Sequence, residues 1–208
     1  MFLRLLVADP ILFSRIIVII IISITLHELS HGIAAISQGD DTPQSTGHMT
    51  LNPVVHLGVS SIVFLCLAGI AWGQMPVNPR KFRHPKWSNI IVSAAGPLLN
   101  LALGVLFVIF LKINVNWATD SIVSSEFLYL VARLNLILFL FNLIPIPPLD
   151  GFHVFSEFFP SFKSLQNSQM GMLFLAILFV GGASRILAQV VDLLICMALN
   201  PPGYCLAG

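Results

Sequence analysis

Charged residues are scarce in this sequence. They make up 9% of the 208 residues, whereas hydrophobic residues make up 57%. Since a water-soluble domain carries about 25% charged residues, the composition excludes an ordinary soluble domain and indicates a chain that faces lipid. An excess of one sign of charge is also missing, because the formal net charge is +1. This balance argues against a general nucleic-acid binder and against a binder of acidic surfaces.

Cysteine is scarce too. The three cysteines, Cys66, Cys196 and Cys205, are far apart, odd in number and not arranged as CxxC. A disulfide framework and a thiolate zinc site are therefore not indicated. We expect all three cysteines to be apolar filler residues.

Long apolar runs, by contrast, are frequent. A helix that crosses about 30 Å of hydrocarbon needs about 20 apolar residues, and five runs are candidates: 10–37, 54–74, 88–112, 124–145 and 170–198. Lipid requires every backbone group to be satisfied within its segment, which favours a helix even where the first run is β-branched. We therefore expect an all-α polytopic membrane protein, a bundle of about four to six transmembrane helices. The last run contains Gly181 and Gly182, so we expect one span followed by an interfacial helix.

Two connectors between these runs carry further signals. Arg80, Lys81, Arg83 and Lys86 lie between the second and third runs, and the positive-inside rule places that loop in the cytoplasm. The residues from Thr50 to Pro53 predict a brief β-strand that ends at the proline.

The first apolar run contains the sequence HELSH, with His27, Glu28 and His31. Residues i and i+4 lie on one helical face, about 6 Å apart along the axis, so both imidazoles can bind one Zn²⁺. Glu28 can take a proton from a water molecule at such a metal. The alternative is a set of buried polar side chains that pair with one another. An ionisable group at bilayer depth costs about 3 kcal/mol, which argues against a cluster without a function.

A catalytic zinc ion usually has three protein ligands and one open position. Asp150 is the candidate that ends a transmembrane run, and three prolines precede it. Prolines remove backbone donors and favour an extended segment, which membrane depth tolerates only where protein or water covers it. We therefore expect residues 142–151 to line a cavity, with Asp150 as the third ligand. The alternative is a helix-end carboxylate at the interface. The other candidates are His48, His56, His84, His153, Glu126, Glu157 and Asp192.

Five segments resemble motifs of the site-2 protease family, the intramembrane zinc metalloproteases. They are similar to the motifs HExxHG, GRxTLNP, VNPRxF, GPxxN and NxxPxPPLDG, and lie in that order at 27–32, 47–53, 76–83, 96–100 and 142–151. The VNPRxF segment resembles the compact members that lack a PDZ domain. The resemblance covers about residues 25–155. Two positions differ from the pattern: His48 stands where an arginine is more usual, and Gly58 stands where an aspartate often follows His56.

The resemblance implies a role for each of several residues. The zinc ligands would be His27, His31 and Asp150, and Glu28 would be the catalytic carboxylate. The residues expected to contact substrate lie in the third run and in the fourth run or just after it: Asn100, Asn142, Pro145 and Pro147. We expect a single transmembrane metalloprotease domain over residues 1–208, with a catalytic core at about 10–155 and a helical region at 156–208.

The expected ligands also restrict the topology. HELSH lies in the C-terminal half of the first run and Asp150 at the C-terminal end of the fourth, so the two helices must run in the same direction to share one ion. Parallel helices need an odd number of crossings between them, so one of the intervening runs should not cross. We expect 54–74 to be a re-entrant or surface-lying hairpin, because Pro53 precedes it and because it contains residues that suit a hairpin: Gly58, Gly69, Gly73 and the paired Ser60 and Ser61. The active site would then face the cytoplasmic leaflet.

The function expected from these residues is hydrolysis of a peptide bond in or near the transmembrane segment of a membrane protein, with Zn²⁺ as cofactor. Such a helix must unwind first, and the edges at 50–52 or 145–149 could receive it by strand addition. The resemblance implies a prokaryotic cell membrane and a signalling substrate, such as an anti-sigma factor or membrane-bound regulator, with no nucleic-acid partner. Two alternatives stay open. A zinc transporter or sensor would want several ligand clusters along a path, and an inactive scaffold would have lost Glu28 or a ligand.

Overall fold

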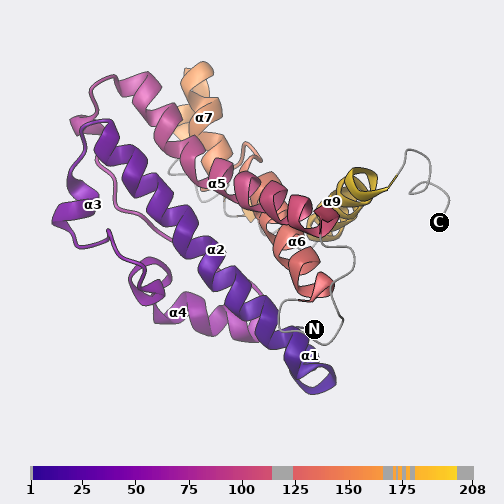
Figure 1. Cartoon of the computed structure of the whole chain (residues 1–208). Helices are drawn as coiled ribbons and strands as arrows, with labels where there is room; N and C mark the ends of the chain where they lie inside the picture. Colours follow the sequence, from indigo (N-terminus) through magenta and orange to yellow (C-terminus); the bar gives the residue numbers. More distant parts are fainter. Residues whose placement is uncertain are drawn as a thin grey trace. The chain divides into compact units, whose positions relative to one another are not determined.

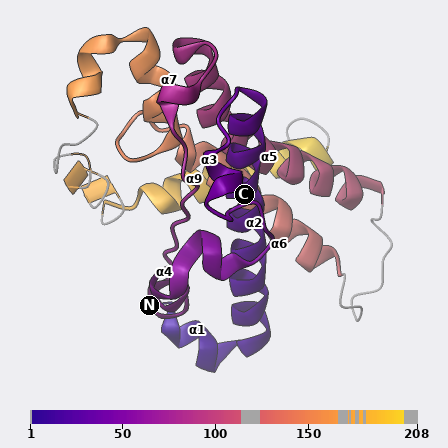
Figure 2. The same cartoon turned by 90° about the vertical axis from the view of Figure 1, so that its left-hand side faces the viewer.

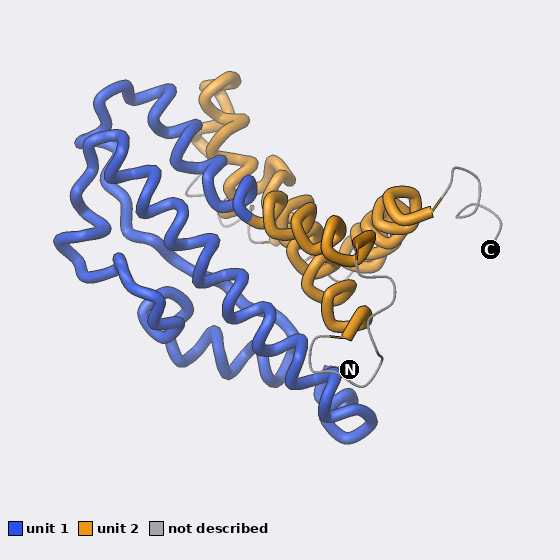
Figure 3. Tube along the Cα trace, viewed as in Figure 1, with its two compact units in different colours: residues 1–99 blue, residues 100–208 orange. Residues whose placement is uncertain are grey.

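A computed structural model of the chain describes residues 2–113, 124–165, 171, 173, 174, 177, 178 and 181–200. The chain divides into two compact units, unit 1 at Met1–Leu99 and unit 2 at Asn100–Gly208 (Figure 3). The expectation of one metalloprotease domain over the whole chain stays a prediction.

Unit 1 is organised around one long helix. The short α1 (Leu3–Ala8) leads into α2 (Pro10–Ser37), which has 28 residues (Figure 1). The side chain of Asp9 caps α2 by accepting a hydrogen bond from the backbone N–H of Leu12, and Pro10 follows at a position that needs no N–H donor. The β-branched run inside α2 is helical, as expected for a segment that faces lipid.

A second apolar helix packs on α2. After the short α3 (Thr42–Ser45), α4 (Pro53–Ala68) lies beside α2 (Figures 1 and 2). Gly58 interrupts α4 with a φ of 70° and a ψ of 161°, and Gly69 ends it with a φ of 73°. Glycine adopts these left-handed values without the steric cost that other residues meet.

The chain then returns along α2 as residues 70–78, which form neither helix nor strand (Figure 2). We call this segment the strap. The 3-10 helix η1 (Pro79–Lys81) and the long α5 (Pro85–Ile113) follow it. Phe82, between η1 and α5, packs with Ala35 of α2 and Val92 of α5 in a small buried cluster, so the connection between the strap and α5 is held against the C-terminal part of α2.

Unit 2 contains the rest of α5 and the helices α6 (Ser125–Asn142), α7 (Asp150–Phe158), η2 (Pro160–Leu165) and α9 (Ala183–Leu199). Its core joins α5, α6 and α9 through five buried residues: Leu111, Leu128, Ala132, Val191 and Ile195.

One polar cluster lies between α6 and α9. Arg133 donates two hydrogen bonds to the carboxylate of Asp192, at 2.5 and 3.0 Å, and the hydroxyl of Tyr129 donates a third at 2.7 Å. A two-pronged arginine–carboxylate pair satisfies both charges in an apolar setting. These residues therefore have a structural role in holding α9 on α6.

Three of the described helices, α2, α5 and α6, are long and apolar enough to cross a membrane. The expected number was about four to six, but α4, with 16 residues, is shorter than a span of about 20 residues. The last apolar run lies partly outside the described residues. Within its described residues, α9 begins directly after Gly182, where the paired glycines predict a break.

Two predictions about local structure are wrong. The described residues contain no β-strand: Thr50 and Leu51 lie in bends and Pro53 begins α4, because so short a segment has no neighbouring strand to pair with. The expected β-strand or re-entrant element after the first span is therefore replaced by α4. The cysteines are not all fillers either, since Cys196 is disulfide-bonded.

Candidate metal centre

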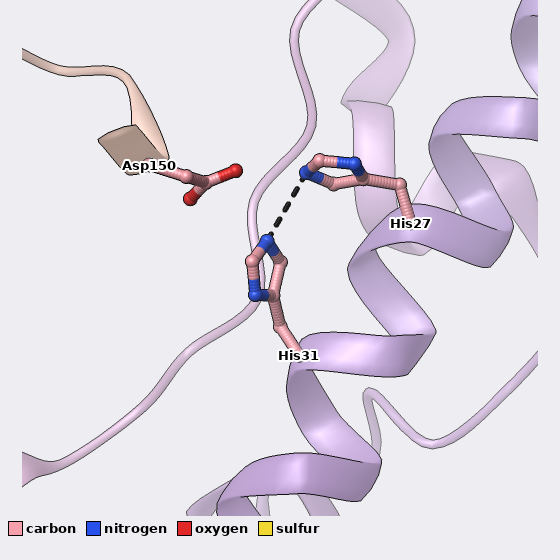
Figure 4. A group of neighbouring side chains, drawn as sticks. All are labelled: His27, His31 and Asp150. Atoms are coloured by element: carbon pink, nitrogen blue, oxygen red, sulfur yellow. Dashed lines mark hydrogen bonds between the residues drawn. The ribbon is translucent and has the colours of Figure 1, made fainter. Parts of the chain in front are cut away.

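Two histidines of α2 form one half of the candidate metal centre. His27 and His31 are one helical turn apart, and each is 7% exposed. Their Nε2 atoms lie 3.1 Å from each other (Figure 4). The spacing of HELSH thus brings the two nitrogens together, as the helical period predicts.

A backbone carbonyl group orients the ring of His31. Its Nδ1 lies 2.6 Å from the carbonyl oxygen of Val92 in α5. Because a carbonyl oxygen only accepts hydrogen bonds, Nδ1 carries the proton and Nε2 keeps its lone pair. Metal-binding histidines commonly use one ring nitrogen in this way, which leaves the other ready for the ion.

The space beside the two imidazoles depends on Gly96 of α5. A Cβ atom at this position would lie 2.4 Å from Nε2 of His31 and 2.5 Å from Nε2 of His27. Any side chain there would occupy the place of the ligand nitrogens. Gly96 is therefore required by the site, which goes beyond the helix-packing role that its small size suggests.

Glu28 faces the strap. A Cβ atom at Gly73 would lie 2.4 Å from Oε1 of Glu28, and one at Gly32, one turn further along α2, would lie 3.0 Å from Cε of Met75. The strap thus follows the face of α2 that carries Glu28 and Gly32, with its backbone directly against the carboxylate side chain. Glu28 is 7% exposed.

The donor set and its geometry suit zinc. Two nitrogens that bind one Zn²⁺ tetrahedrally at about 2.0–2.1 Å lie about 3.3 Å apart, close to the 3.1 Å between the imidazole nitrogens. Asp150 is the first residue of α7 and adds a carboxylate. His27, His31 and Asp150 each offer one ligand atom of a kind that Zn²⁺ binds (Figure 4).

The place of Asp150 in unit 2 depends on its neighbours. A Cβ atom at Gly151 would lie 2.3 Å from the backbone oxygen of Leu143, so the first turn of α7 packs closely on the end of α6 only because residue 151 is glycine. Residues 143–149 form turns and bends, with a cis peptide bond between Pro147 and Pro148. The prolines thus break the helix as expected, although the segment is folded back rather than extended.

The residues expected to contact substrate have different surroundings. Asn100 is fully buried, and its amide donates a hydrogen bond of 3.0 Å to Asn135 of α6, a structural contact in unit 2. The Asn142 amide donates to the backbone oxygen of Leu138 in its own helix, at 3.0 Å. Pro145 is exposed and Pro147 half-buried. Their role in substrate binding stays a prediction.

The residues that support Glu28 could not be identified from the sequence. From the sequence, Gly73 and Ser61 are expected only to suit a hairpin, and no role is expected for Asp40. Ser61 and Asp40 both bond to the strap. Their partners lie 11 and 38 residues away along the chain, and no local pattern indicates such pairs. For the histidines, Gly96 in the segment that resembles GPxxN is the one residue whose motif could have indicated a role at the site.

Comparison with known proteins gives one family. The model of Peptidase family M50 matches residues 15–117 and 112–181. No solved structure matches this chain.

Curated relatives come from bacteria and an archaeon. The protein named "Putative zinc metalloprotease YwhC" from Bacillus subtilis (strain 168) is 34% identical over 178 residues, which are 81% of each chain. "Putative zinc metalloprotease Rip2" from Mycolicibacterium smegmatis is 30% identical over 64% of this chain and 52% of its own. "Zinc metalloprotease MJ0392" from Methanocaldococcus jannaschii is 27% identical over 69% of this chain and 34% of its own. This chain thus spans most of the first relative, and about half and a third of the others.

Proposed function

We propose that this chain, which belongs to Peptidase family M50, the family of the site-2 proteases, is an intramembrane zinc metalloprotease. Three apolar helices of membrane-spanning length and the family together make it an integral membrane protein. The relatives named as zinc metalloproteases support the cofactor. The 3.1 Å approach of two imidazole nitrogens inside an apolar helix is the observation that carries the proposal.

The proposed ligands are Nε2 of His27, Nε2 of His31 and a carboxylate oxygen of Asp150. Two observations support the histidines: the carbonyl group of Val92 leaves Nε2 of His31 unprotonated, and Gly96 leaves space beside both rings. The donor chemistry supports Asp150, because two imidazoles and one carboxylate are a known catalytic zinc set that leaves a fourth position open.

Bound zinc would supply Lewis acidity, which polarises a carbonyl group and lowers the pKa of water to about 7. Glu28 is the proposed general base. It follows His27 directly, so its carboxylate projects from a neighbouring face of α2, and it would accept the proton of the attacking water and pass it to the leaving amine. The burial of Glu28 supports this role, since a carboxylate in an apolar helix without a function is costly.

The proposed substrate is a membrane protein cut in or near its transmembrane segment. A helical segment hides its carbonyl groups in hydrogen bonds, and freeing one in lipid costs several kcal/mol. Groups that hydrogen-bond an unwound backbone would offset this cost. The proposed contacts are the amides of Asn142 and Asn100, which can donate, and the carbonyl groups of Pro145 and Pro147, which can accept. An anti-sigma factor or another membrane-bound regulator is the proposed kind of substrate.

The proposed location is a prokaryotic cell membrane, with the active site towards the cytoplasmic leaflet. The basic residues that support this orientation lie between the strap and α5: Arg80, Lys81, Arg83 and Lys86. Both η1 and the C-terminal end of α2 belong to unit 1, and Arg83 N–H donates to the carbonyl group of Gln38. The end of α2 nearest to HELSH therefore lies beside the basic loop.

The test compares purified wild type with Glu28→Gln. A panel of fluorogenic single-span peptides in lipid vesicles is first screened with wild type, and the peptide that wild type cleaves fastest is used for the comparison. We expect Glu28→Gln to keep its zinc and to lose about 10²–10⁴-fold in cleavage rate. Glu126→Gln, which changes an exposed carboxylate of α6, is the control and should cleave as wild type does. Unchanged cleavage by Glu28→Gln would refute the base assignment, and zinc flux into vesicles without cleavage would favour a transporter.

A further inference from the structure

The strap is held at three places along its length. The N–H and C=O of Trp72 both bond to the hydroxyl of Ser61. Further on, the N–H of Gln74 donates to the carbonyl group of His56, at 2.9 Å. At its end, the N–H of Asn78 donates to the carboxylate of Asp40, at 2.6 Å. Three anchors in a segment without helix or strand indicate that its path is specified.

The anchor at Ser61 has an unusual form. The hydroxyl donates to the carbonyl oxygen of Trp72 at 2.7 Å and accepts from the N–H of the same residue at 2.8 Å. A single side chain thus satisfies both backbone groups of one residue, as a neighbouring strand would. Ser61 lies in the apolar α4 and is fully buried, where a hydroxyl group without partners would be costly.

The residue after this anchor is the one that lies against Glu28. Gly73 follows Trp72 directly, and its Cα lies so close to Glu28 that an added Cβ would be 2.7 Å from Cγ and 2.8 Å from Cδ of the carboxylate side chain. Two residues later, the buried Met75 lies against Gly32 on the same face of α2. The backbone held by Ser61 is therefore one wall of the space in which Glu28 sits.

We propose that Ser61 is a positioning residue for Glu28: by holding both backbone groups of Trp72, it fixes Gly73 against the carboxylate side chain and so sets the direction of Glu28. Ser61 bonds to the strap and acts through it. This inference rests on the proposed function, because it assigns a support to the proposed general base. It predicts that loss of the hydroxyl slows the proton-transfer step and leaves His27 and His31 in place, since both histidines lie on the side of α2 that faces α5.

The experiment compares variants of the full-length protein in lipid vesicles with the same single-span peptide. Ser61→Ala removes the hydroxyl, and Ser61→Cys keeps the size but hydrogen-bonds weakly. Ser61→Thr keeps the hydroxyl and is the rescue variant. The matched control is Ser60→Ala, which changes the neighbouring exposed serine. Each variant is measured for kcat, KM and bound zinc, with Glu28→Gln alongside.

We expect kcat to fall about tenfold in Ser61→Ala and by a smaller factor in Ser61→Cys, because small misplacements of a catalytic group are expensive. KM and zinc content should stay within about twofold of wild type, since the lost interaction acts in the transition state. Ser61→Thr should keep more than half of kcat, and Ser60→Ala should match wild type.

Three outcomes would overturn the proposal: an unchanged kcat in both Ser61→Ala and Ser61→Cys, a loss of activity that follows a loss of zinc, or a loss in Ser61→Thr as large as in Ser61→Ala. The last two would indicate a general packing role. Failure of the proposed function has a different signature: wild type would then cleave no peptide of the panel, and failure of the base assignment would leave Glu28→Gln cleaving as fast as wild type, whatever the serine variants do.

Discussion

Two faces of α2 carry the histidines and the glutamate of the proposed site, and they are supported in different ways. The histidine face packs on another helix, where Val92 orients His31 and Gly96 leaves space for both rings. The glutamate face packs on the strap, an irregular segment held by side-chain hydrogen bonds. A helix with a continuous hydrogen-bond ladder holds its neighbours more rigidly than a segment with isolated anchors. Metal binding and proton transfer should therefore be separable by mutation.

The largest effect is expected at the histidine face. In Gly96→Ala, the new methyl group would lie within 2.4–2.6 Å of three imidazole atoms, so the rings must move. We expect bound zinc to fall below half of the wild-type content and the cleavage rate to fall by about 100-fold. This is the upper end of the range for mutations of residues that orient a metal ligand. Metal analysis and the peptide assay measure this. Leu98→Ala, two residues away and exposed, is the control, and full zinc content in Gly96→Ala would show that the rings have room to adapt.

The next effect is expected at the glutamate face. In Gly73→Ala, the new Cβ would lie 2.4 Å from Oε1 of Glu28, so the carboxylate or the strap must shift. We expect cleavage to fall by about 10²-fold, as a shift of about 1 Å can cause, while zinc content stays near that of wild type. The same two assays apply. Equal loss of zinc in the Gly73 and Gly96 variants would mean that the two faces of α2 are not independent.

A smaller effect is expected at the far end of the strap. Asp40 is fully buried and accepts hydrogen bonds from the N–H of Asn78 and from the N–H and hydroxyl of Thr42. Asp40→Ala leaves these donors without their acceptor, at a cost of about 1–3 kcal/mol for a buried group. We expect a lower thermal midpoint and a cleavage rate that falls less than in Gly73→Ala, because Asn78 is further from Glu28. A wild-type midpoint would show that this anchor is dispensable.

The smallest effect is expected next to it, at the exposed pair of Asp41 and Lys81. The Lys81 ammonium lowers the pKa of the Asp41 carboxyl below 3.8, and Asp41 raises the pKa of Lys81 above 10.5. The stabilising contribution of Asp41 is therefore present above its usual pKa and lost as pH falls through its lowered value, and that of Lys81 is lost as pH rises through its raised value. Since exposed pairs contribute little, Asp41→Asn should change neither the thermal midpoint nor cleavage at pH 7. An effect as large as that of Asp40→Ala would contradict this contrast.

Local patterns predicted the parts of the site that lie within one segment. HELSH has the spacing that brings two imidazoles together in any helix, and the apolar runs indicated helices that α2, α5 and α6 confirm. The predicted β-strand failed because a strand needs a second strand to pair with. The segment from Thr50 to Pro53 has strand-like residues, but among the described residues no second strand lies beside it, and Pro53 begins a helix instead.

The sequence by itself determined the helical pair of imidazoles and the membrane class, because helical periodicity and hydropathy are properties of consecutive residues. Only the tertiary structure decided which surfaces surround that pair: Gly96 beside the imidazoles and Gly73 beside the carboxylate, with Ser61 and Asp40 holding the strap. Those contacts join residues that are 11 to 69 positions apart, and such distances are set by how the chain packs, which no short stretch of sequence encodes.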